Sequence, residues 1–442
     1  MRNNRILVAL VTAMMTAFVV VFCFLPRSSY SELERRDLLR FPEFSWKSFC
    51  DGSFTQNVSN WFSDSEPFRD VFMKESMELK SLMAFKTKSA VTFHAAQENT
   101  ESEDVPIVAS SGIASTVEAT GDQRAIEEYH NDLNANVKME NAGVIVVGNA
   151  PDARALMAFK NKKKGESYAN VVNTYQKVFG PEVNIYCMVI PTAVEYYCPA
   201  NAKSCTDPEY PALTELYAMI DSTVHVVDLY NLMGRHVDED IYLRTDHHWS
   251  PLGAYYAARQ FAEVAKVKVP VLSDFEPDTI KGYVGSMYGY SKDINVKKSP
   301  ENFVYYKPTK VEYNTTYIKY DLDEEFRIVG EGKPHEGDFF VKMSGSGSAY
   351  CTFMGSDARI TQVKTTADCP RRLLLMKDSF GNAIPGYLFD SFEEIHVIDF
   401  RYFTYNIKDY IQEHGITDIL MANNISHVCS GAIGKSYRNF LN

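Results

Sequence analysis

The sequence predicts an α/β fold in which a mostly parallel sheet is covered by helices on both faces. Short apolar runs alternate with segments of helical periodicity along residues 144–264 and again along 373–421, and such runs have the length of buried strands. Parallel strands need long crossover connections, which are usually helices, so this alternation indicates a three-layer α/β/α arrangement. The chain has 442 residues, 45% of them hydrophobic and 23% charged, which is enough for a large core.

The expected elements follow one another from residue 144 onward. We expect strands at 144–147, 183–190, 225–229, 373–376, 394–399 and 418–421, and helices at 167–178, 210–220, 252–264 and between the last three strands. The stretch 270–370 breaks the pattern, because it is rich in Gly, Tyr, Ser and Lys and contains strand-like pieces at 326–329 and 339–341. We expect this stretch to form a β-rich insertion, either a lid or a side module.

The first 26 residues have the pattern of a membrane anchor. Arg2 and Arg5 precede an apolar run over 6–25, about the length that spans a bilayer, and the positive charges predict that this end stays in the cytoplasm. The run is followed by no small-x-small cleavage pattern, which favours a transmembrane signal anchor over a cleaved signal peptide, and the bulky Phe22 disfavours lipid attachment at Cys23. These features predict a single-pass protein of the plasma membrane with the remaining chain on the extracytoplasmic side.

The rest of the chain divides into three parts. Residues 27–95 form a membrane-proximal segment, in which apolar residues at helical spacing over 54–85 predict a helix. Residues 96–122 are polar and small, which predicts a flexible insertion or linker. Residues 123–442 then form the main domain, with the insertion at 270–370 inside it.

Charge and cysteine content narrow the classes of function. The formal net charge is −12, and no basic stripe is present, so nucleic acid is excluded as an expected partner. Cys198 and Cys205 flank a polar loop that a disulfide could close. Zinc is the alternative for these two cysteines, but it has no paired CxxC or HExxH spacing to support it.

Two motifs together carry the groups of a nucleophilic acyl-transfer site. The stretch 245–249 supplies Asp246 and His248 two residues apart, a spacing that lets the carboxylate orient the imidazole. Ser250 and Pro251 follow as a helix N-cap and first helical residue, so the Asp/His pair lies in the loop entering a helix. Ser379 follows an apolar strand and precedes a helix start, where backbone N–H groups are available to a substrate.

Each motif also has a simpler interpretation. His248 and Trp249 could be a buried pair that packs the helix start, and Ser379 with Asp378 could merely cap a helix. His247 fits a packing role better than a chemical one. A metal site at Asp246, His247 and His248 is disfavoured, because adjacent histidines do not easily bind one ion without a third, distant ligand.

An acyl-transfer site also requires donors for the developing oxyanion. The backbone N–H of Ser379 is one candidate. Arg401 follows one expected strand, and Asn423 and Asn424 end another. Because the carboxyl ends of parallel strands meet at the same edge of a sheet, these side chains are the oxyanion or substrate-binding candidates.

The stretch 245–256, Thr-Asp-His-His-Trp-Ser-Pro-Leu-Gly-Ala-Tyr-Tyr, resembles the DHHW proteins, which are similar to the SGNH-hydrolase-like alginate O-acetyltransferases. Further stretches with this likeness are 31–36, 51–54, 67–70, 189–192, 285–288 and 398–402. The likeness covers most of residues 30–442, with 96–122 excepted.

The resemblance implies an SGNH-like three-layer fold with permuted block order, because the Asp-x-His element precedes the serine. It maps Asp246, His248 and Ser379 onto a catalytic triad, and it places Asn423 or Asn424 near the family's oxyanion asparagine. The usual Gly-Asp-Ser start is Lys-Asp-Ser at 377–379 in this chain, so one glycine is missing. The family further implies a surface polysaccharide as substrate and a membrane-bound O-acyltransferase as the partner that supplies acetyl groups.

The expected function is therefore extracytoplasmic O-acetylation of a cell-surface or exported polysaccharide through an acetyl-serine intermediate, with no cofactor and no metal. One alternative is a carbohydrate acetylesterase that uses the same site with water as acceptor. The other is a non-catalytic glycan-binding protein of the cell surface, which would account for the tyrosines Tyr283, Tyr288, Tyr290, Tyr305, Tyr306, Tyr313, Tyr317 and Tyr320.

Overall fold

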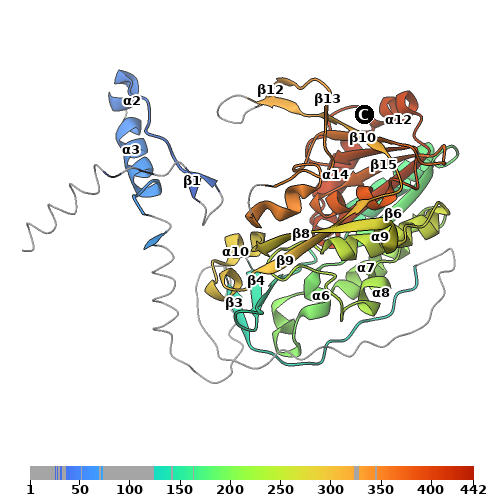
Figure 1. Cartoon of the computed structure of the whole chain (residues 1–442), viewed down its shortest axis with the longest axis horizontal. Helices are drawn as coiled ribbons and strands as arrows, with labels where there is room; N and C mark the ends of the chain where they lie inside the picture. Colours follow the sequence, from blue (N-terminus) through green and yellow to red (C-terminus); the bar gives the residue numbers. More distant parts are fainter. Residues whose placement is uncertain are drawn as a thin grey trace, which may run out of the picture. The chain divides into compact units, whose positions relative to one another are not determined.

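The structure is a computed structural model, and it divides the chain into two units, Met1–Phe85 and Lys86–Asn442 (Figure 1). It describes residues 25, 27, 30–31, 36–50, 52–68, 71–72, 124–140, 143–162, 164–322, 328–343 and 346–442. The predicted insertion at 96–122 lies outside these ranges, as does nearly all of the predicted anchor at 1–26. Within the described ranges, no helix has both the length and the apolar character needed to cross a membrane.

The described residues of the first unit include a two-stranded antiparallel sheet and the helices α2 (Trp46–Cys50) and α3 (Ser53–Asp64). The sheet pairs β1 (Tyr30–Ser31) with β2 (Arg36–Asp37). The first helix in the range 54–85 ends at Asp64, and the described residues 71–72 of the same range are helical again. Ser65 takes the C-cap position with its N–H bonded to Trp61, and Pro67 follows, which disfavours helical backbone at the residue before it. The second half of that prediction, from residue 73 on, lies outside the described residues.

The second unit is built on an eight-stranded mixed sheet in the order β13-β10-β14-β16-β15-β17-β6-β7. The five strands from β16 to β7 are parallel, and the pairings from β13 to β16 are antiparallel. The strands of this sheet are β6 (Asn184–Ile190), β7 (His225–Val226), β10 (Tyr313–Ile318), β13 (His335–Gly337), β14 (Ile360–Thr365), β15 (Arg372–Lys377), β16 (Glu394–Asp399) and β17 (Asp418–Asn424).

Neighbouring residues of β6 show that helices cover both faces of this sheet. The ring of Tyr186 packs edge-on against Phe261 of α9 (Pro251–Ala265), at 5.1 Å between centroids. The thiol of the next residue, Cys187, faces Tyr168 of α5 (Glu166–Phe179). Because successive side chains of a strand point to opposite faces, α9 and α5 lie on opposite sides of the sheet. The predicted three layers are therefore present, and β15, β16 and β17 are buried on both faces.

The strand predicted at 144–147 does not belong to the central sheet. It is β4 (Val144–Val147), the middle strand of a separate three-stranded antiparallel sheet with β3 (Val137–Glu140) and β5 (Arg154–Met157). A run of four buried β-branched residues fits the centre of either kind of sheet, so the sequence pattern alone did not distinguish them.

The β-rich character predicted for 270–370 is confirmed, but the stretch is not a separate module. Its strands β10, β13 and β14 extend the central sheet. Among the described residues of this stretch, two pairs of strands stand apart from that sheet. These are β8 (Phe275–Tyr283) with β9 (Glu301–Pro308), and β11 (Tyr320–Leu322) with β12 (Ile328–Glu331) (Figure 1).

Helices and 3₁₀ turns connect these strands. The segment between β15 and β16, predicted as helix, consists of the 3₁₀ turns η5 (Ser379–Ala383) and η6 (Pro385–Leu388). The remaining helical elements are α6 (Ala193–Tyr197), η2 (Ala200–Cys205), α7 (Glu209–Met219), α8 (Tyr230–Arg235), η3 (Leu272–Asp274), α10 (Ser286–Ser291), α11 (Ile294–Lys297), η4 (Ser346–Thr352), α12 (Ile407–His414), α13 (Ile425–Ser430) and α14 (Ala432–Asn439).

The two cysteines that flank 199–204 are not joined. Cys198 and Cys205 are both buried free thiols, and the first of them contacts the carbonyl of Pro199. The disulfide that the spacing allowed is therefore absent from the structure.

Candidate active site

Ser379 stands where the central strand β15 ends. The strand closes at Lys377, whose neighbours in register are Asp399 of β16 and Ala422 of β17. Asp378 then caps η5, with its carboxylate accepting a hydrogen bond from the N–H of Phe380 at 3.0 Å. This cap turns the chain sharply and leaves Ser379 partly exposed at the carboxyl edge of the parallel strands.

The loop that carries Asp246 and His248 is held at both ends. Tyr242 and Trp249 form an antiparallel bridge across it, and the N–H of Ser250 bonds the carbonyl of Ile241. Ser250 then caps α9 by accepting from Gly253, with proline at the first helical position, as the sequence predicted.

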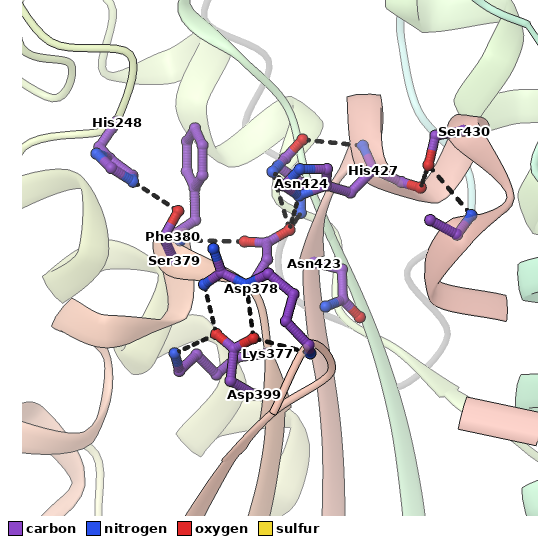
Figure 2. Close-up of polar contacts among 12 residues, drawn as sticks. His248, Lys377, Asp378, Ser379, Phe380, Asp399, Asn423, Asn424, His427 and Ser430 are labelled. Carbon is purple, nitrogen blue, oxygen red and sulfur yellow. Dashed lines mark hydrogen bonds and ion pairs between the residues drawn. The ribbon is translucent and has the colours of Figure 1, made fainter. Parts of the chain in front are cut away.

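The two motifs meet in a chain of hydrogen bonds. His248 Nε2 lies 2.8 Å from Ser379 Oγ, and His248 Nδ1 lies 2.6 Å from Asp246 Oδ1 (Figure 2 shows the contact with Ser379). Asp246 and His248 are buried. With a proton on Nδ1 facing the carboxylate, Nε2 is the ring nitrogen that can take the serine proton.

Asp246 is surrounded by donors. Its Oδ2 accepts from the hydroxyl of Tyr283 and from the N–H of Ser286, both at 2.8 Å, and its Oδ1 also accepts from the backbone N–H of His248. Burial opposes ionisation, but the charge and hydrogen bond of His248 outweigh it and hold the pKa of Asp246 well below its usual range. The carboxylate is thus fixed in place and ionised at neutral pH.

We expect Gly285→Ala to reduce the acylation rate at this site by about 10²-fold, because a displacement of about 1 Å at a reacting group costs that much. A Cβ at this position would collide with Cβ and Cα of Asp246. The release of nitrophenol from 4-nitrophenyl acetate measures the rate. Gly289→Ala is the matched control, since a Cβ there meets nothing within 4 Å. Equal rates in the two variants would contradict the prediction.

Aromatic rings fix the plane of the His248 imidazole. The ring of Tyr350 stacks on it at 3.9 Å between centroids and 4° between planes. The hydroxyl of Tyr350 and the indole N–H of Trp249 both donate to the carbonyl of Phe380, at 3.1 and 3.0 Å. This carbonyl therefore links Trp249 and Tyr350, the two residues that contact or adjoin His248, to the turn that carries Ser379.

His247 lies beside the pair, with its Nδ1 3.7 Å from Oδ1 of Asp246. Its Nδ1 is 2.6 Å from the hydroxyl of Ser286, and its ring contacts that of His248 at 3.8 Å. Burial and the neighbouring imidazole lower the pKa of His247 to about 4, so this ring is neutral at physiological pH.

Asp246, His247 and His248 are also a possible cation site, since their ligand atoms lie within 4.8 Å of one another. Three protein ligands are typical of catalytic zinc. However, Nδ1 of His248 contacts Asp246 and Nε2 contacts Ser379, so metal binding and the hydrogen-bonded chain would compete for the same atoms.

The three side chains predicted to help an oxyanion or substrate are directed elsewhere. Asn423 is buried against the hydroxyls of Tyr168 and Tyr437. The amide of Asn424 donates to Asp378, not to the position in front of Ser379 (Figure 2). The guanidinium of Arg401 binds both oxygens of Asp399 at 2.7 Å. The sequence placed all three at the correct edge of the sheet, but side-chain direction within that edge is set by these partners.

A buried ion network lies under the nucleophile turn. Lys377 Nζ is 2.7 Å from Asp399 and 2.8 Å from Asp357, and Arg401 bonds the same two carboxylates (Figure 2 shows Lys377 and Asp399). The side-chain amide of Asn382 donates a hydrogen bond to Asp357 at 2.9 Å. The backbone N–H of Ser379 has no acceptor among the described residues, which leaves it available as an oxyanion donor.

Sequence patterns did not identify Tyr283, Ser286 or Tyr350 as site residues. The matching stretch 285–288 was a signal for Ser286, and Tyr283 was counted only among tyrosines expected to meet glycan. Of those eight tyrosines, only Tyr290 is exposed, at 45%. Tyr283, Tyr288, Tyr305 and Tyr317 are buried, and the other three are half-buried, so half of the group packs in the interior.

The fold and the site together define a class of α/β proteins. In this class, a hydrogen-bonded Asp–His–Ser chain lies at the carboxyl edge of the central strands of a mixed sheet. The chain belongs to the DHHW protein family, whose pattern matches residues 94–398. No curated protein matches the sequence.

One solved structure supports this assignment, and two others are more distant in sequence. A DHHW family protein from Eubacterium siraeum is 34% identical, covers 70% of this chain and 98% of its own length, and superposes with a TM-score of 0.62. Bacillus cereus PatB1 with a sulfonyl adduct is 18% identical, covering 68% and 99%, with a TM-score of 0.51, and so shares the fold. The O-acetyltransferase domain of Pseudomonas putida AlgJ is 11% identical, covering 69% and 99%, with a TM-score of 0.38.

Proposed function

We propose that this DHHW protein is an extracytoplasmic O-acetyltransferase of SGNH type that modifies a cell-surface or exported polysaccharide. The observation that carries the proposal is the 2.8 Å contact between Ser379 Oγ and His248 Nε2, with Asp246 holding the other ring nitrogen at 2.6 Å. This geometry suits proton transfer from a hydroxyl nucleophile. The family resemblance supports acetyl transfer in particular, and the sulfonyl adduct in the structure of PatB1 fits a fold that presents a reactive nucleophile.

The proposed reaction has two halves. In the first, His248 takes the proton of Ser379, the oxygen attacks the acetyl carbonyl of the donor, and the protonated leaving group departs. In the second, His248 takes the proton of a sugar hydroxyl, whose oxygen attacks the acetyl-serine. The bond to Ser379 breaks, and the proton returns from His248 to Oγ. Asp246 stabilises the imidazolium in both halves, and the N–H of Ser379 faces the oxyanion.

The N-terminal residues and the donor belong to the same proposal. The apolar run over 6–25 would anchor the chain in the plasma membrane with the α/β unit outside. A membrane-bound O-acyltransferase would then pass acetyl groups across the bilayer to Ser379. The permuted order of the Asp-x-His and serine elements relative to other SGNH proteins fits the same active-site geometry, because the triad is defined by position in space.

Incubation of the full-length chain with 4-nitrophenyl acetate and a glycan oligosaccharide tests the proposal. We expect mass spectrometry to find an acetyl group on Ser379 after quenching, and acetyl esters on the oligosaccharide at longer times. Acetate release without sugar ester would identify an acetylesterase instead. Glycan binding without any acetyl-enzyme would identify a non-catalytic binding protein.

A further inference from the structure

A second aspartate–histidine pair lies next to Ser379. Asp378, the residue before the serine, is fully buried, and its Oδ2 lies 3.0 Å from Nδ1 of His427 in the first turn of α13 (Figure 2). The same oxygen accepts from the backbone N–H of Asn424 at 2.8 Å and from its side-chain amide at 2.9 Å. The hydrogen bonds of Asp246 and His248 do not involve this second pair.

The surroundings of the ring determine where its proton lies. The amide nitrogen of Asn424 is 2.9 Å from the same Nδ1, but a bare lone pair on Nδ1 would face the carboxylate of Asp378 and be repelled. The proton therefore lies on Nδ1, as in His248. Burial disfavours the charged ring, yet the bond to Asp378 outweighs burial and raises the pKa of His427 above its ordinary value.

The far nitrogen of His427 is available to a substrate. The side chain is 41% exposed, and Nε2 has no hydrogen-bond partner within the part of the chain that the structure describes. In the first pair, the corresponding nitrogen of His248 is occupied by Ser379. One serine is thus flanked by two aspartate–histidine pairs, one closed on its hydroxyl and the other open to solvent.

Backbone contacts hold this ring in place. The N–H of His427 donates to Oδ1 of Asn424, which caps α13, at 3.1 Å. The ring of Phe400, which follows β16, packs 5.6 Å from the imidazole between centroids. The open nitrogen is therefore fixed relative to the nucleophile.

We infer that Nε2 of His427 binds a second hydroxyl of the acceptor sugar and so orients the ring for attack on the acetyl-serine. This inference rests on the proposed transferase function. A sugar carries hydroxyls on adjacent carbons, so while His248 takes the proton of the attacking hydroxyl, His427 holds its neighbour. A hydroxyl can donate to the neutral imidazole or accept from the protonated one. Water has no second hydroxyl, so this contact favours transfer over hydrolysis.

His427→Asn tests the inference, because the Nδ2 of asparagine occupies the place of the histidine Nδ1 and can still donate to Asp378. It retains the structural bond and removes the open nitrogen. We expect the ratio of sugar ester to free acetate, with 4-nitrophenyl acetate as donor, to fall about three- to tenfold, the worth of one hydrogen bond. The KM for the sugar should rise by a similar factor. With methanol as acceptor, the two enzymes should give the same ratio of ester to acetate.

His130→Asn is the matched control, since that histidine is exposed, at 56% for its side chain, and its ratio should equal that of the wild type. A wild-type ratio in His427→Asn would overturn the inference and leave His427 a structural partner of Asp378. An equal fall in ester formation with methanol would overturn it as well, because a single hydroxyl cannot use the second contact. A wild-type protein that forms acetyl-serine but no sugar ester would overturn the transferase function and the acceptor site together.

Discussion

The Ser379→Ala variant should fold and lose acetyl transfer by a factor on the order of 10⁴ to 10⁶, which is the range for serine nucleophiles with an oriented histidine. The expectation follows from the chain of contacts at 2.6 and 2.8 Å that joins Asp246, His248 and Ser379. Removal of the hydroxyl leaves no oxygen to carry the acetyl group. Quantification of acetyl esters on an oligosaccharide measures the loss.

A matched control separates loss of the nucleophile from loss of a buried hydroxyl. Ser391 is buried and donates one hydrogen bond to the carbonyl of Lys268, at 2.6 Å, so Ser391→Ala should keep its transfer rate. The double variant of Ser379→Ala with His248→Ala should be no slower than either single one, because the two residues act as a unit. Transfer at more than about a tenth of the wild-type rate in Ser379→Ala would rule out an acetyl-serine route, given the factors above.

Local signals in the sequence were enough to locate these groups. Ser250 and Pro251 form the N-cap and first residue of α9 as predicted, which places Asp246 and His248 in the preceding loop. The apolar run before Lys377 became the central strand β15. Both predictions rest on helix caps and strand ends. These features are set by neighbouring residues, so the folded protein retains them.

The contacts that support these groups depend on tertiary packing, which no local pattern encodes. Tyr350 stacks on His248 from η4, about a hundred residues away in sequence, and Tyr283 reaches Asp246 from the end of β8. No sequence motif indicates a role for His427. It meets its partner Asp378 only because the pairing of β15 with β17 brings the ends of these two strands together. The predicted roles of Asn423 and Arg401 failed for the same reason. A position at a strand end predicts which edge of the sheet a residue lies on, but it does not predict where its side chain points.

The position of Ser379 depends on the buried ions directly before it. Lys377 has a side chain that is 1% exposed and sits between Asp399, at 0%, and Asp357, at 20%. Burial opposes ionisation of the two carboxyls, but the charges of Lys377 and Arg401 outweigh it and lower the pKa values of Asp357 and Asp399. Gly381 packs directly on this lysine, since a Cβ there would lie 2.5 Å from Cβ of Lys377. The network therefore fixes the turn around Ser379 on both sides, at Lys377 before the serine and at Gly381 after it.

We expect Lys377→Met to destabilise the protein by about 3–5 kcal/mol, because breaking a buried pair leaves its partner charge uncompensated. Arg401 alone would then face the two carboxylates of Asp357 and Asp399. Chemical denaturation at pH 7 measures the change. The double variant of Lys377→Met with Asp399→Asn should recover part of the loss, since it removes the stranded charge.

The pH dependence identifies the charges as the cause. In the wild type, the lowered pKa values of Asp357 and Asp399 stabilise the folded state above the ordinary carboxyl pKa of about 3.9, and this contribution is lost as pH falls through the lowered values. In Lys377→Met the two carboxyls are uncompensated, so protonation relieves the folded state. The difference in stability between the wild type and Lys377→Met should thus be largest near neutrality and shrink below about pH 4.

Lys364→Met is the matched control. This lysine is 75% exposed and lies 4.0 Å from Glu394, so its replacement should change stability little at any pH. A pH-independent loss in Lys377→Met would instead indicate that the aliphatic stem, and not the ammonium, holds the turn.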